Sequence, residues 1–262
     1  YMSNLILSDI KDNILNITLN NPSSQNTLSL DIIKSLNEII LDSEKDREVK
    51  VIIIKSTGKI FSAGHNLKEI TLHRQDSDKG LKFFTTLINS CSNLMLNILK
   101  IPKPVIAEVN GIATAAGCQL VATCDLAYAS SESFFATPGV NIGLFCSTPM
   151  VALSRVSKNK HAMEMLLTGD LISAKKAKKI ALINNYFDHN NLSNEVNLIA
   201  KKIANKSSLT LKIGKKAFYE QSEMNIIDSY NYASKIMITN MMESDADEGI
   251  SAFIDKRQPK WK

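Results

Sequence analysis

The chain has no long hydrophobic run. None of its apolar stretches approaches the ~20 residues that a helix needs to cross a bilayer, although 44% of the 262 residues are hydrophobic. Its first residues also lack the charged, apolar and small-residue order of a secretory signal peptide. These absences predict a globular protein with a substantial core and no membrane partner.

Cysteine is scarce, and its spacing excludes two common uses. The four cysteines, Cys91, Cys118, Cys124 and Cys146, form neither a CxxC pair nor a zinc-ligand spacing, so we expect no metal site. Their apolar surroundings favour reduced, buried thiols, which are typical of a reducing compartment. We therefore expect a cytoplasmic location.

Arginine and aromatic residues are also few. The sequence has arginine only at positions 47, 74, 155 and 257, aromatic residues make up 6%, and the net charge of +5 comes mainly from dispersed lysines. Nucleic-acid binding usually needs a focused basic stripe with aromatic platforms, so we expect no nucleic-acid partner. The mild positive charge suits small anionic ligands, although an ordinary solvated surface explains it more simply.

Strands and helices alternate through the first two thirds of the chain. Apolar alternation predicts a β-hairpin over residues 4–19, and β-branched runs predict buried strands at 51–54 and 104–109. Helical spacing of apolar residues predicts helices near 32–40, capped by Thr27 or Ser29, and over 79–99. The pattern after residue 195 is helical. We therefore predict an α/β core with a parallel sheet over residues 1–195 and an all-helical region over 196–262.

Small residues dominate residues 110–125. Gly111 opens a turn after the strand at 104–109, and Ala115, Ala116 and Gly117 permit a close approach to the backbone. If a helix begins near Ala116, its first amides can hold an oxyanion or a phosphate. Tight packing of a small-residue helix on a sheet explains the same pattern equally well.

Six short motifs occur in a characteristic order along the chain. They are Leu-Asn-Asn-Pro at 19–22 with Asn26, Phe-Ser-Ala-Gly-His-Asn-Leu-Lys at 61–68, the segment 102–125, Phe-Ala-Thr-Pro at 135–138, Leu-Thr-Gly-Asp at 167–170 with Ile-Ser-Ala at 172–174, and residues 248–261. Together they resemble the crotonase superfamily, the enoyl-CoA hydratase/isomerase fold, over nearly the whole length. The sequence is most similar to a branch of enoyl-CoA hydratase domain-containing proteins that lacks both catalytic glutamates.

The resemblance implies a ββα spiral core with a C-terminal helical region that builds a homotrimer or hexamer. It also implies a lyase of fatty acid metabolism whose partner is an acyl-CoA thioester, with coenzyme A as part of the substrate and no separate cofactor. In this family two backbone amides polarise the thioester carbonyl and stabilise the enolate. By position these amides belong to His65 and Ala116, with Gly117 as the neighbouring alternative.

The sequence departs from the family at both catalytic carboxylates. The two glutamates of hydratases fall at Gln119 and Gly139, and neither residue can transfer a proton near neutral pH. We therefore expect hydration to be severely impaired. Two alternatives remain open, namely decarboxylation of a malonyl-type acyl-CoA, which forms an enolate without a base, and binding without catalysis.

The resemblance also assigns contacts and leaves several side chains open. It implies an acyl pocket at Thr137, Pro138 and Cys146, and coenzyme A contacts at Ser23, Ser24, Gln25, Ala63, Gly64, His65, Asn66, Leu67, Phe253, Lys256 and Lys260. The His65 imidazole either replaces a missing acid or base or simply faces coenzyme A or the surface, and the latter is favoured. Cys146 is either a nucleophile or, as we favour, a packed thiol, and Asp125 at a helix end favours a structural role.

Overall fold

Two β-sheets organise the chain in the computed structural model, which describes residues 5–262, so the first residue of the predicted hairpin lies outside the described residues. The larger sheet has six strands in the order β1-β2-β3-β5-β7-β10, and only the β1–β2 pair is antiparallel. The smaller sheet has the order β4-β6-β8-β9. The strands are β1 (Ile6–Lys11), β2 (Ile14–Leu19), β3 (Val51–Ser56), β4 (Ile60–Ser62), β5 (Val105–Val109), β6 (Ile112–Thr114), β7 (Leu126–Ser130), β8 (Phe134–Ala136), β9 (Ile172–Ser173) and β10 (Asn185–Phe187).

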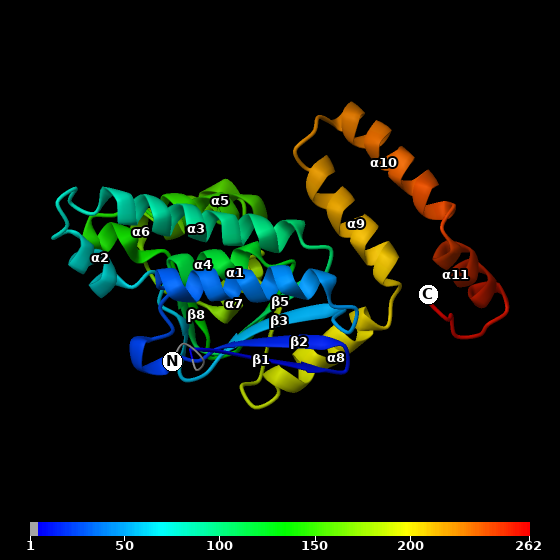
Figure 1. Cartoon of the computed structure of the whole chain (residues 1–262), viewed down its shortest axis with the longest axis horizontal. Coiled ribbons are helices and arrows are strands. Elements are labelled where there is room, and N and C mark those ends of the chain that lie inside the picture. Colours follow the sequence, from blue (N-terminus) through cyan, green and yellow to red (C-terminus); the bar gives the residue numbers. More distant parts are fainter. Residues whose placement is uncertain (1–4) are drawn as a thin grey trace.

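Strand pairs alternate between the two sheets. In each of the pairs β3–β4, β5–β6 and β7–β8, the first strand joins the larger sheet and the second joins the smaller one. Helices follow each pair, so the chain winds through a repeated ββα unit (Figure 1). This arrangement confirms the predicted α/β spiral core.

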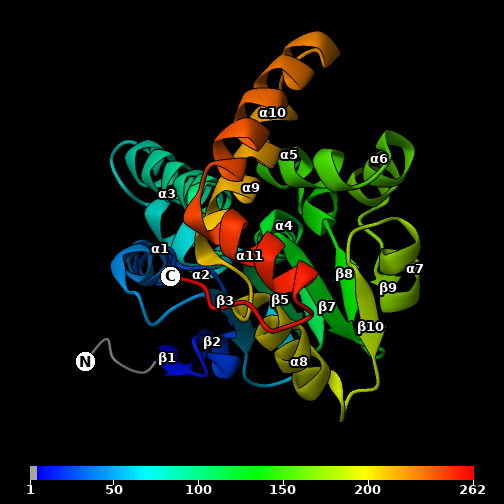
Figure 2. The same ribbon diagram turned by 90° about the vertical axis from the view of Figure 1, so that its right-hand side faces the viewer.

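The helices lie mainly on one side of the larger sheet, and α8 covers the other side (Figures 1 and 2). They are α1 (Leu30–Lys45), α2 (Leu67–His73), α3 (Leu81–Lys100), α4 (Ala116–Thr123), α5 (Ser147–Val156), α6 (Asn159–Thr168), α7 (Ala174–Lys179), α8 (Leu192–Ala204), α9 (Ser208–Gln221), α10 (Ile226–Met241) and α11 (Ser244–Ile254), with the 3₁₀ helices η1 (Pro22–Ser24) and η2 (Pro138–Ile142).

The β-branched run of β3 is buried on both faces, as predicted. Val51 and Ile53 pack toward α8, whereas Ile52 and Ile54 enter the main core because successive side chains of a strand point to opposite faces. The hairpin is also confirmed, since Asp12 and Asn13 take positive φ angles of 54° and 62°, as a two-residue turn between twisted strands requires.

Ser29, one of the two predicted caps, begins α1. Its side chain accepts a hydrogen bond from the Ile32 amide at 3.3 Å, which satisfies one of the unpaired donors of the first turn. The short helix α2 was not predicted. Its signal was Asn66, whose side-chain oxygen accepts hydrogen bonds from the amides of Lys68 and Glu69 at 3.1 and 3.4 Å.

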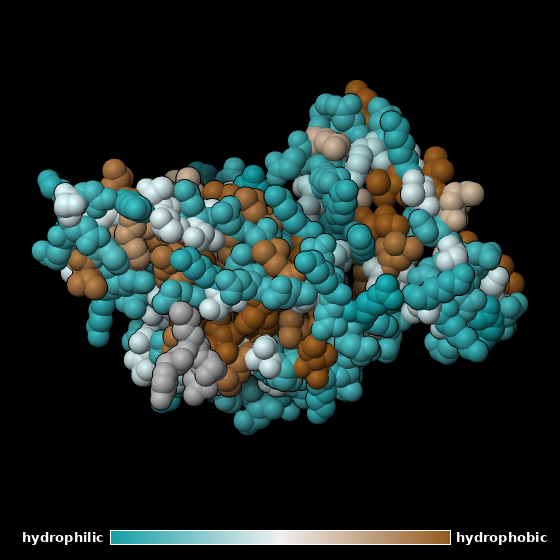
Figure 3. Space-filling view, viewed as in Figure 1, coloured by the Kyte–Doolittle hydropathy of each residue, from teal (hydrophilic) through white to brown (hydrophobic). Residues whose placement is uncertain are grey.

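Helices α9, α10 and α11 extend beyond the sheets (Figures 1 and 2). Hydrophobic side chains are exposed on parts of these helices (Figure 3). Met242 and Phe253 are 83% and 85% exposed. The predicted boundary after residue 195 falls inside α8, whose residues Leu192, Val196 and Ala200 pack on the larger sheet. In the described part of the chain, every helix is too short or too polar to span a bilayer.

Candidate active site

Three segments that contain predicted site residues lie along one edge of the smaller sheet. Strands β4, β6 and β8 are parallel, so their carboxyl ends meet at the same edge. The segments that follow them are residues 63–67, 115–119 and 137–139, and the Ala115 amide donates to the Ala136 carbonyl at 3.0 Å. Three of the family-like motifs, far apart in sequence, therefore meet in space.

Gly64 lies against the start of α4. Its φ is +86°, and a β-carbon placed on it would lie 2.8 Å from Ala115 Cβ and 3.1 Å from the Ala116 nitrogen. A side chain at position 64 would therefore separate the two segments and strain the backbone. The absence of that side chain brings the backbone before His65 close to the Ala116 amide.

Ala115 holds a strained conformation directly before α4. Its φ of 49° and ψ of −119° are rare for a residue with a side chain and cost about 1–3 kcal/mol, as is common at functional sites. Ala116 is the first residue of the helix, so its amide has no acceptor within the helix and lies at the positive end of the helix dipole.

Gly117 has a packing role. A β-carbon there would lie 2.4 Å from the Ser62 carbonyl oxygen, so this glycine allows α4 to approach β4. The sequence left oxyanion binding and tight packing as alternatives for this stretch, and the packing is present at Gly117. The assignment of hole amides to His65 and Ala116, or to Gly117, stays a prediction.

The His65 imidazole is turned inward. Its Nδ1 lies 3.2 Å from the Leu28 carbonyl oxygen, and the backbones of the two residues form an isolated parallel bridge. Burial lowers the pKa of His65, opposed by the hydrogen bond to Leu28. Its Nε2 is buried without a hydrogen-bond partner, which disfavours the surface-facing alternative. Sequence reasoning missed Leu28, because a backbone carbonyl leaves no signal in the residue type.

Two further polar atoms of the predicted site lack partners. Gln119 and Thr137 are 4% and 0% exposed, and Gln119 Oε1 and Thr137 Oγ1 form no hydrogen bond. Residues 5–262 contain five such buried side-chain atoms, and three of them belong to His65, Gln119 and Thr137. An unsatisfied buried polar group costs about 1–3 kcal/mol, so bound water or a ligand is expected to supply partners for these three atoms.

No side chain fits at Gly139. A β-carbon there would lie 2.4 Å from the Leu144 carbonyl oxygen and 2.9 Å from Cys146 Sγ. The thiol therefore occupies the space where a side chain of residue 139 would begin. Burial raises the pKa of the Cys146 thiol, while the Gly139 amide opposes this, so the group is protonated at neutral pH. This favours the packed thiol over the nucleophile.

The loop with Ser23, Ser24 and Gln25 lies beside the same edge. The Ala63 amide donates to the Gln25 carbonyl at 3.1 Å, and Asn26 Nδ2 donates to the carbonyls of Thr57 and Ile60 at 2.8 and 2.7 Å. Residues 23–25 are exposed, as is Leu67 at the start of α2. These positions are accessible to a large polar ligand, whereas the Asn66 side chain is used to cap α2.

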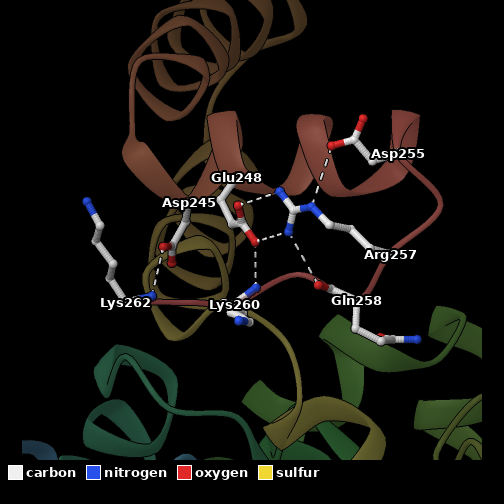
Figure 4. A network of polar contacts seen from close by, with 7 residues as sticks. All are labelled: Asp245, Glu248, Asp255, Arg257, Gln258, Lys260 and Lys262. Carbon is white, nitrogen blue, oxygen red and sulfur yellow. Dashed lines mark hydrogen bonds and ion pairs between the residues drawn. The ribbon is translucent and has the colours of Figure 1, made fainter.

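Phe253, Lys256 and Lys260 lie elsewhere in the chain. Figure 1 shows α11 at the opposite end of the molecule from α2, so one chain does not bring these residues to the candidate site. The segment after α11 is instead held against that helix (Figure 4): Arg257 forms an ion pair with Glu248 at 2.7 Å, and the Lys260 amide donates to the same carboxylate. Their contacts with coenzyme A stay a prediction.

Asp125 has the structural role that its position favours. Its carboxylate accepts hydrogen bonds from the Val105 amide at 2.7 Å, from Lys215 Nζ at 2.6 Å and from the Tyr219 hydroxyl at 2.8 Å. Lys215 Nζ also donates to the carbonyls of Ile98 and Lys103. This network fastens α9 to the end of α4. Sequence reasoning missed Lys215 and Tyr219 because they lie 90 and 94 positions after Asp125.

Curated relatives align with nearly the whole chain. The enoyl-CoA hydratase domain-containing protein 3 of Xenopus laevis is 48% identical over 248 residues, which cover 95% of this chain and 83% of the relative. The human protein of the same name is 46% identical over 250 residues, covering 95% of this chain and 81% of the relative.

These relatives are named as mitochondrial proteins, which contradicts the predicted cytoplasmic location. That prediction was wrong because buried free cysteines indicate only that a compartment is reducing. They do not distinguish one reducing compartment from another.

Solved structures agree with the sequence comparison. A crystal structure of human enoyl-CoA hydratase domain-containing protein 3 matches with a TM-score of 0.93 and 45% identity, covering 98% of this chain and all of that chain. An enoyl-CoA hydratase from Mycobacterium smegmatis gives a TM-score of 0.93 with 42% identity, covering 98% of each chain. The family described as enoyl-CoA hydratase/isomerase matches residues 9–262. The chain therefore belongs to the enoyl-CoA hydratase/isomerase family.

Proposed function

We propose that this protein binds an acyl-CoA thioester and stabilises its enolate with the backbone amides of His65 and Ala116. The observation that carries the proposal is the contact between Gly64 and the Ala116 nitrogen, which only a residue without a side chain allows. Two amides at one edge of a sheet, one at a helix start, suit an oxygen that gains negative charge. Family membership supports the class of substrate.

The site supports an enolate-forming reaction better than the addition of water. Gln119 and Gly139 provide no carboxylate, and the orphaned Gln119 Oε1 can accept a hydrogen bond but cannot take a proton near neutral pH. Decarboxylation of a malonyl-type CoA fits these residues. The bond to the carboxylate breaks, its electron pair enters the thioester enolate, carbon dioxide leaves, and a proton then adds to the α-carbon.

The coenzyme A portion is assigned to the exposed loop of residues 23–25 and to residues 63–67. Phe253, Lys256 and Lys260 contribute only if α11 of another copy reaches the site, which is consistent with the exposed apolar surface of the C-terminal helices. We therefore propose a homotrimer or hexamer that acts in fatty acid metabolism as an acyl-CoA lyase.

Calorimetry with acetyl-CoA and crotonyl-CoA tests the binding proposal, and saturable binding is expected. Folded protein that binds neither at millimolar concentration would exclude it.

A coupled assay then ranks the reactions: malonyl-CoA or methylmalonyl-CoA should turn over faster than crotonyl-CoA is hydrated. The reverse ranking would exclude the decarboxylase.

A protein that binds acyl-CoA without turnover is the second candidate, and the loss of both ionisable positions favours it. Incubation with a panel of acyl-CoAs, followed by mass spectrometry, separates the two. Product that disappears in a folded Ala116→Pro variant would establish an enzyme, because proline removes the amide hydrogen. Circular dichroism of the variant controls for folding.

A further inference from the structure

His65 offers two separate groups to the candidate site, its backbone amide and its imidazole, and the proposed function uses only the amide. We propose that the imidazole is the base that removes the α-proton of the bound acyl-CoA thioester. This step rests on the proposed function, because the thioester must first occupy the site.

The hydrogen bond to Leu28 fixes the state of the ring. A carbonyl oxygen only accepts hydrogen bonds, so Nδ1, 3.2 Å away, carries the proton. In the neutral imidazole, Nε2 then holds a free electron pair. Burial keeps the ring neutral by lowering its pKa from 6.5. The charged residues closest in sequence to His65 and Leu28 on the two flanking helices are Lys68 and Glu69 of α2 and Asp31 of α1.

Nε2 is sealed inside the protein without a partner. Its electron pair is therefore not engaged by any protein donor and can accept a hydrogen bond or a proton from a group that enters the site. Gln119 Oε1 and Thr137 Oγ1, at the same edge of the sheet, are unpartnered as well. Each of the three atoms can accept a hydrogen bond from a bound ligand.

The other site side chains do not serve as bases near neutral pH. The amide of Gln119 and the hydroxyl of Thr137 do not accept a proton, and burial keeps the Cys146 thiol protonated by raising its pKa. The carboxylate of Glu69 is directed to α1, where it accepts a hydrogen bond from the Leu30 amide at 3.3 Å. Among these groups, His65 Nε2 has the free electron pair that the reaction requires.

The proposed step is balanced without any oxidant or co-reactant. The α-carbon–hydrogen bond breaks, the proton moves to Nε2, and the electron pair enters the enolate, whose oxygen is held by the two amides. In the imidazolium, Nδ1 still donates its hydrogen bond to the Leu28 carbonyl, and this bond stabilises the positive charge. Nε2 then returns a proton to the α-carbon or, in a β,γ-unsaturated chain, to the γ-carbon, which moves the double bond.

The test compares wild-type protein with His65→Asn in two assays. One measures deuterium uptake at the α-carbon of butyryl-CoA in D₂O by mass spectrometry. The other follows isomerisation of 3-butenoyl-CoA to crotonyl-CoA, which registers the proton transfer even if the buried base returns the same proton. We expect His65→Asn to lower both rates at least about 100-fold at saturating acyl-CoA, a condition that separates loss of the base from any loss of affinity.

Asparagine is chosen because its side-chain amide can donate to the Leu28 carbonyl as Nδ1 does, so the local fold is retained. His189→Asn, at an exposed loop position, is the matched control and should keep wild-type rates. In the wild type, both rates should fall as the pH drops through the lowered pKa of His65, below 6.5, and should be flat above it. This profile serves as the test if the variant does not fold.

Exchange in His65→Asn at the wild-type rate would overturn the inference. So would wild-type protein that binds acyl-CoA but catalyses neither reaction, a result that would leave the proposed binding intact. Failure of the wild type to bind acyl-CoA at all would instead overturn the proposed function, and the inference with it.

Discussion

Missing side chains shape the candidate site as much as those present. Gly64 and Gly117 allow the backbone of residues 62–64 to lie close to the start of α4. At Gly139, the Leu144 carbonyl and the Cys146 thiol fill the space that a side chain would need. At position 139, where the family resemblance places a glutamate, the loop therefore leaves no room for a side chain. A carboxylate cannot be returned there without moving the backbone.

This packing makes hydration difficult to restore. The double variant Gln119→Glu/Gly139→Glu should show no measurable crotonyl-CoA hydration. A smaller change, Gly139→Ala, should lower the free energy of unfolding by about 1–3 kcal/mol, because the added methyl group overpacks the site. Urea denaturation and a hydration assay measure these effects. The control is Gly214→Ala, which should not destabilise the protein because Gly214 lies in a helix with open space around it. Gly143→Ala is unsuitable because the φ of Gly143 is positive. Hydration by the double variant at a rate typical of the family would refute this account of Gly139.

Single residues were partly predictable. The segments around His65, Ala116 and Thr137 were identified because their sequences resemble motifs of the family. The inward imidazole was not favoured from the sequence, since its orientation depends on the Leu28 carbonyl, and a carbonyl is common to every residue. The packing of Cys146 against Gly139 was hidden for a similar reason: it depends on how the loop folds.

At the scale of elements, one buried ion pair links the C-terminal helices to the helix that begins at Ala116. Asp125 follows α4, and Lys215 and Tyr219 project from α9 onto its carboxylate. The Lys215 ammonium also joins the end of α3 and the approach to β5 through two carbonyls. The position of α9 and the C-terminal end of α4 are therefore coupled.

Removing this ammonium should destabilise the fold. Lys215→Met leaves the Asp125 carboxylate without its charged partner, and breaking a buried pair in this way typically costs about 3–5 kcal/mol. Chemical denaturation provides the measurement. Lys216→Met is the matched control, because the side chain of Lys216 is 69% exposed and its pair with Glu220 is 3.8 Å long, so its effect should stay below about 0.5 kcal/mol. Equal losses in the two variants would contradict the anchoring role.

The segment after α11 should respond to acid. Hydrogen bonds from Arg257 and then from the Lys260 amide lower the pKa of Glu248 from 4.5 to about 2 (Figure 4). A lowered carboxyl pKa stabilises the folded segment fully above about 4.5, and this contribution is lost as the pH falls toward 2. The single tryptophan, Trp261, reports the change because its indole donates to the Asn205 carbonyl at 2.8 Å.

We therefore expect the fluorescence of Trp261 to shift between pH 4.5 and 2 in the wild type. In Glu248→Gln the emission at pH 7 should already resemble that of the acidified wild type. Emission that is constant over this range, or unaffected by the substitution, would show that the ion pair does not hold the segment.

At the scale of the whole molecule, the C-terminal helices expose many large apolar side chains, as surfaces that contact another protein commonly do. The large side chains that are more than half exposed on α10 and α11 or between them are Ile226, Ile227, Tyr230, Met237, Ile238, Met241, Met242, Ile250, Phe253 and Ile254. Such a surface fits the trimer or hexamer that we propose.

Analytical ultracentrifugation should give the mass of a trimer or hexamer for the wild type. Met242→Glu/Phe253→Glu should lower the mass, since it places charges in the centre of an apolar contact. Lys235→Glu, which replaces one exposed charge with another, is the control for the change of sign. A monomeric wild type at micromolar concentration would disprove the proposed assembly.

Much of the architecture could be predicted from the sequence, because alternating strands and helices produce local patterns of hydrophobic residues. The hairpin, the buried strand β3 and the long helices α1 and α3 were found in this way. The division of strands between two sheets depends on contacts distant in sequence. The boundary after residue 195 shows the same limit, since only the packing of α8 on the larger sheet reveals that residues on both sides of position 195 belong to one helix.

The central claim is that the amides of His65 and Ala116 polarise an acyl-CoA thioester, and infrared difference spectroscopy measures that polarisation directly. With acetyl-CoA labelled with ¹³C at the thioester carbonyl, we predict that the carbonyl band moves to lower frequency on binding and that the shift is reduced in Gly64→Val, whose side chain would separate the two segments. A bound thioester whose carbonyl frequency equals that in water would contradict the claim.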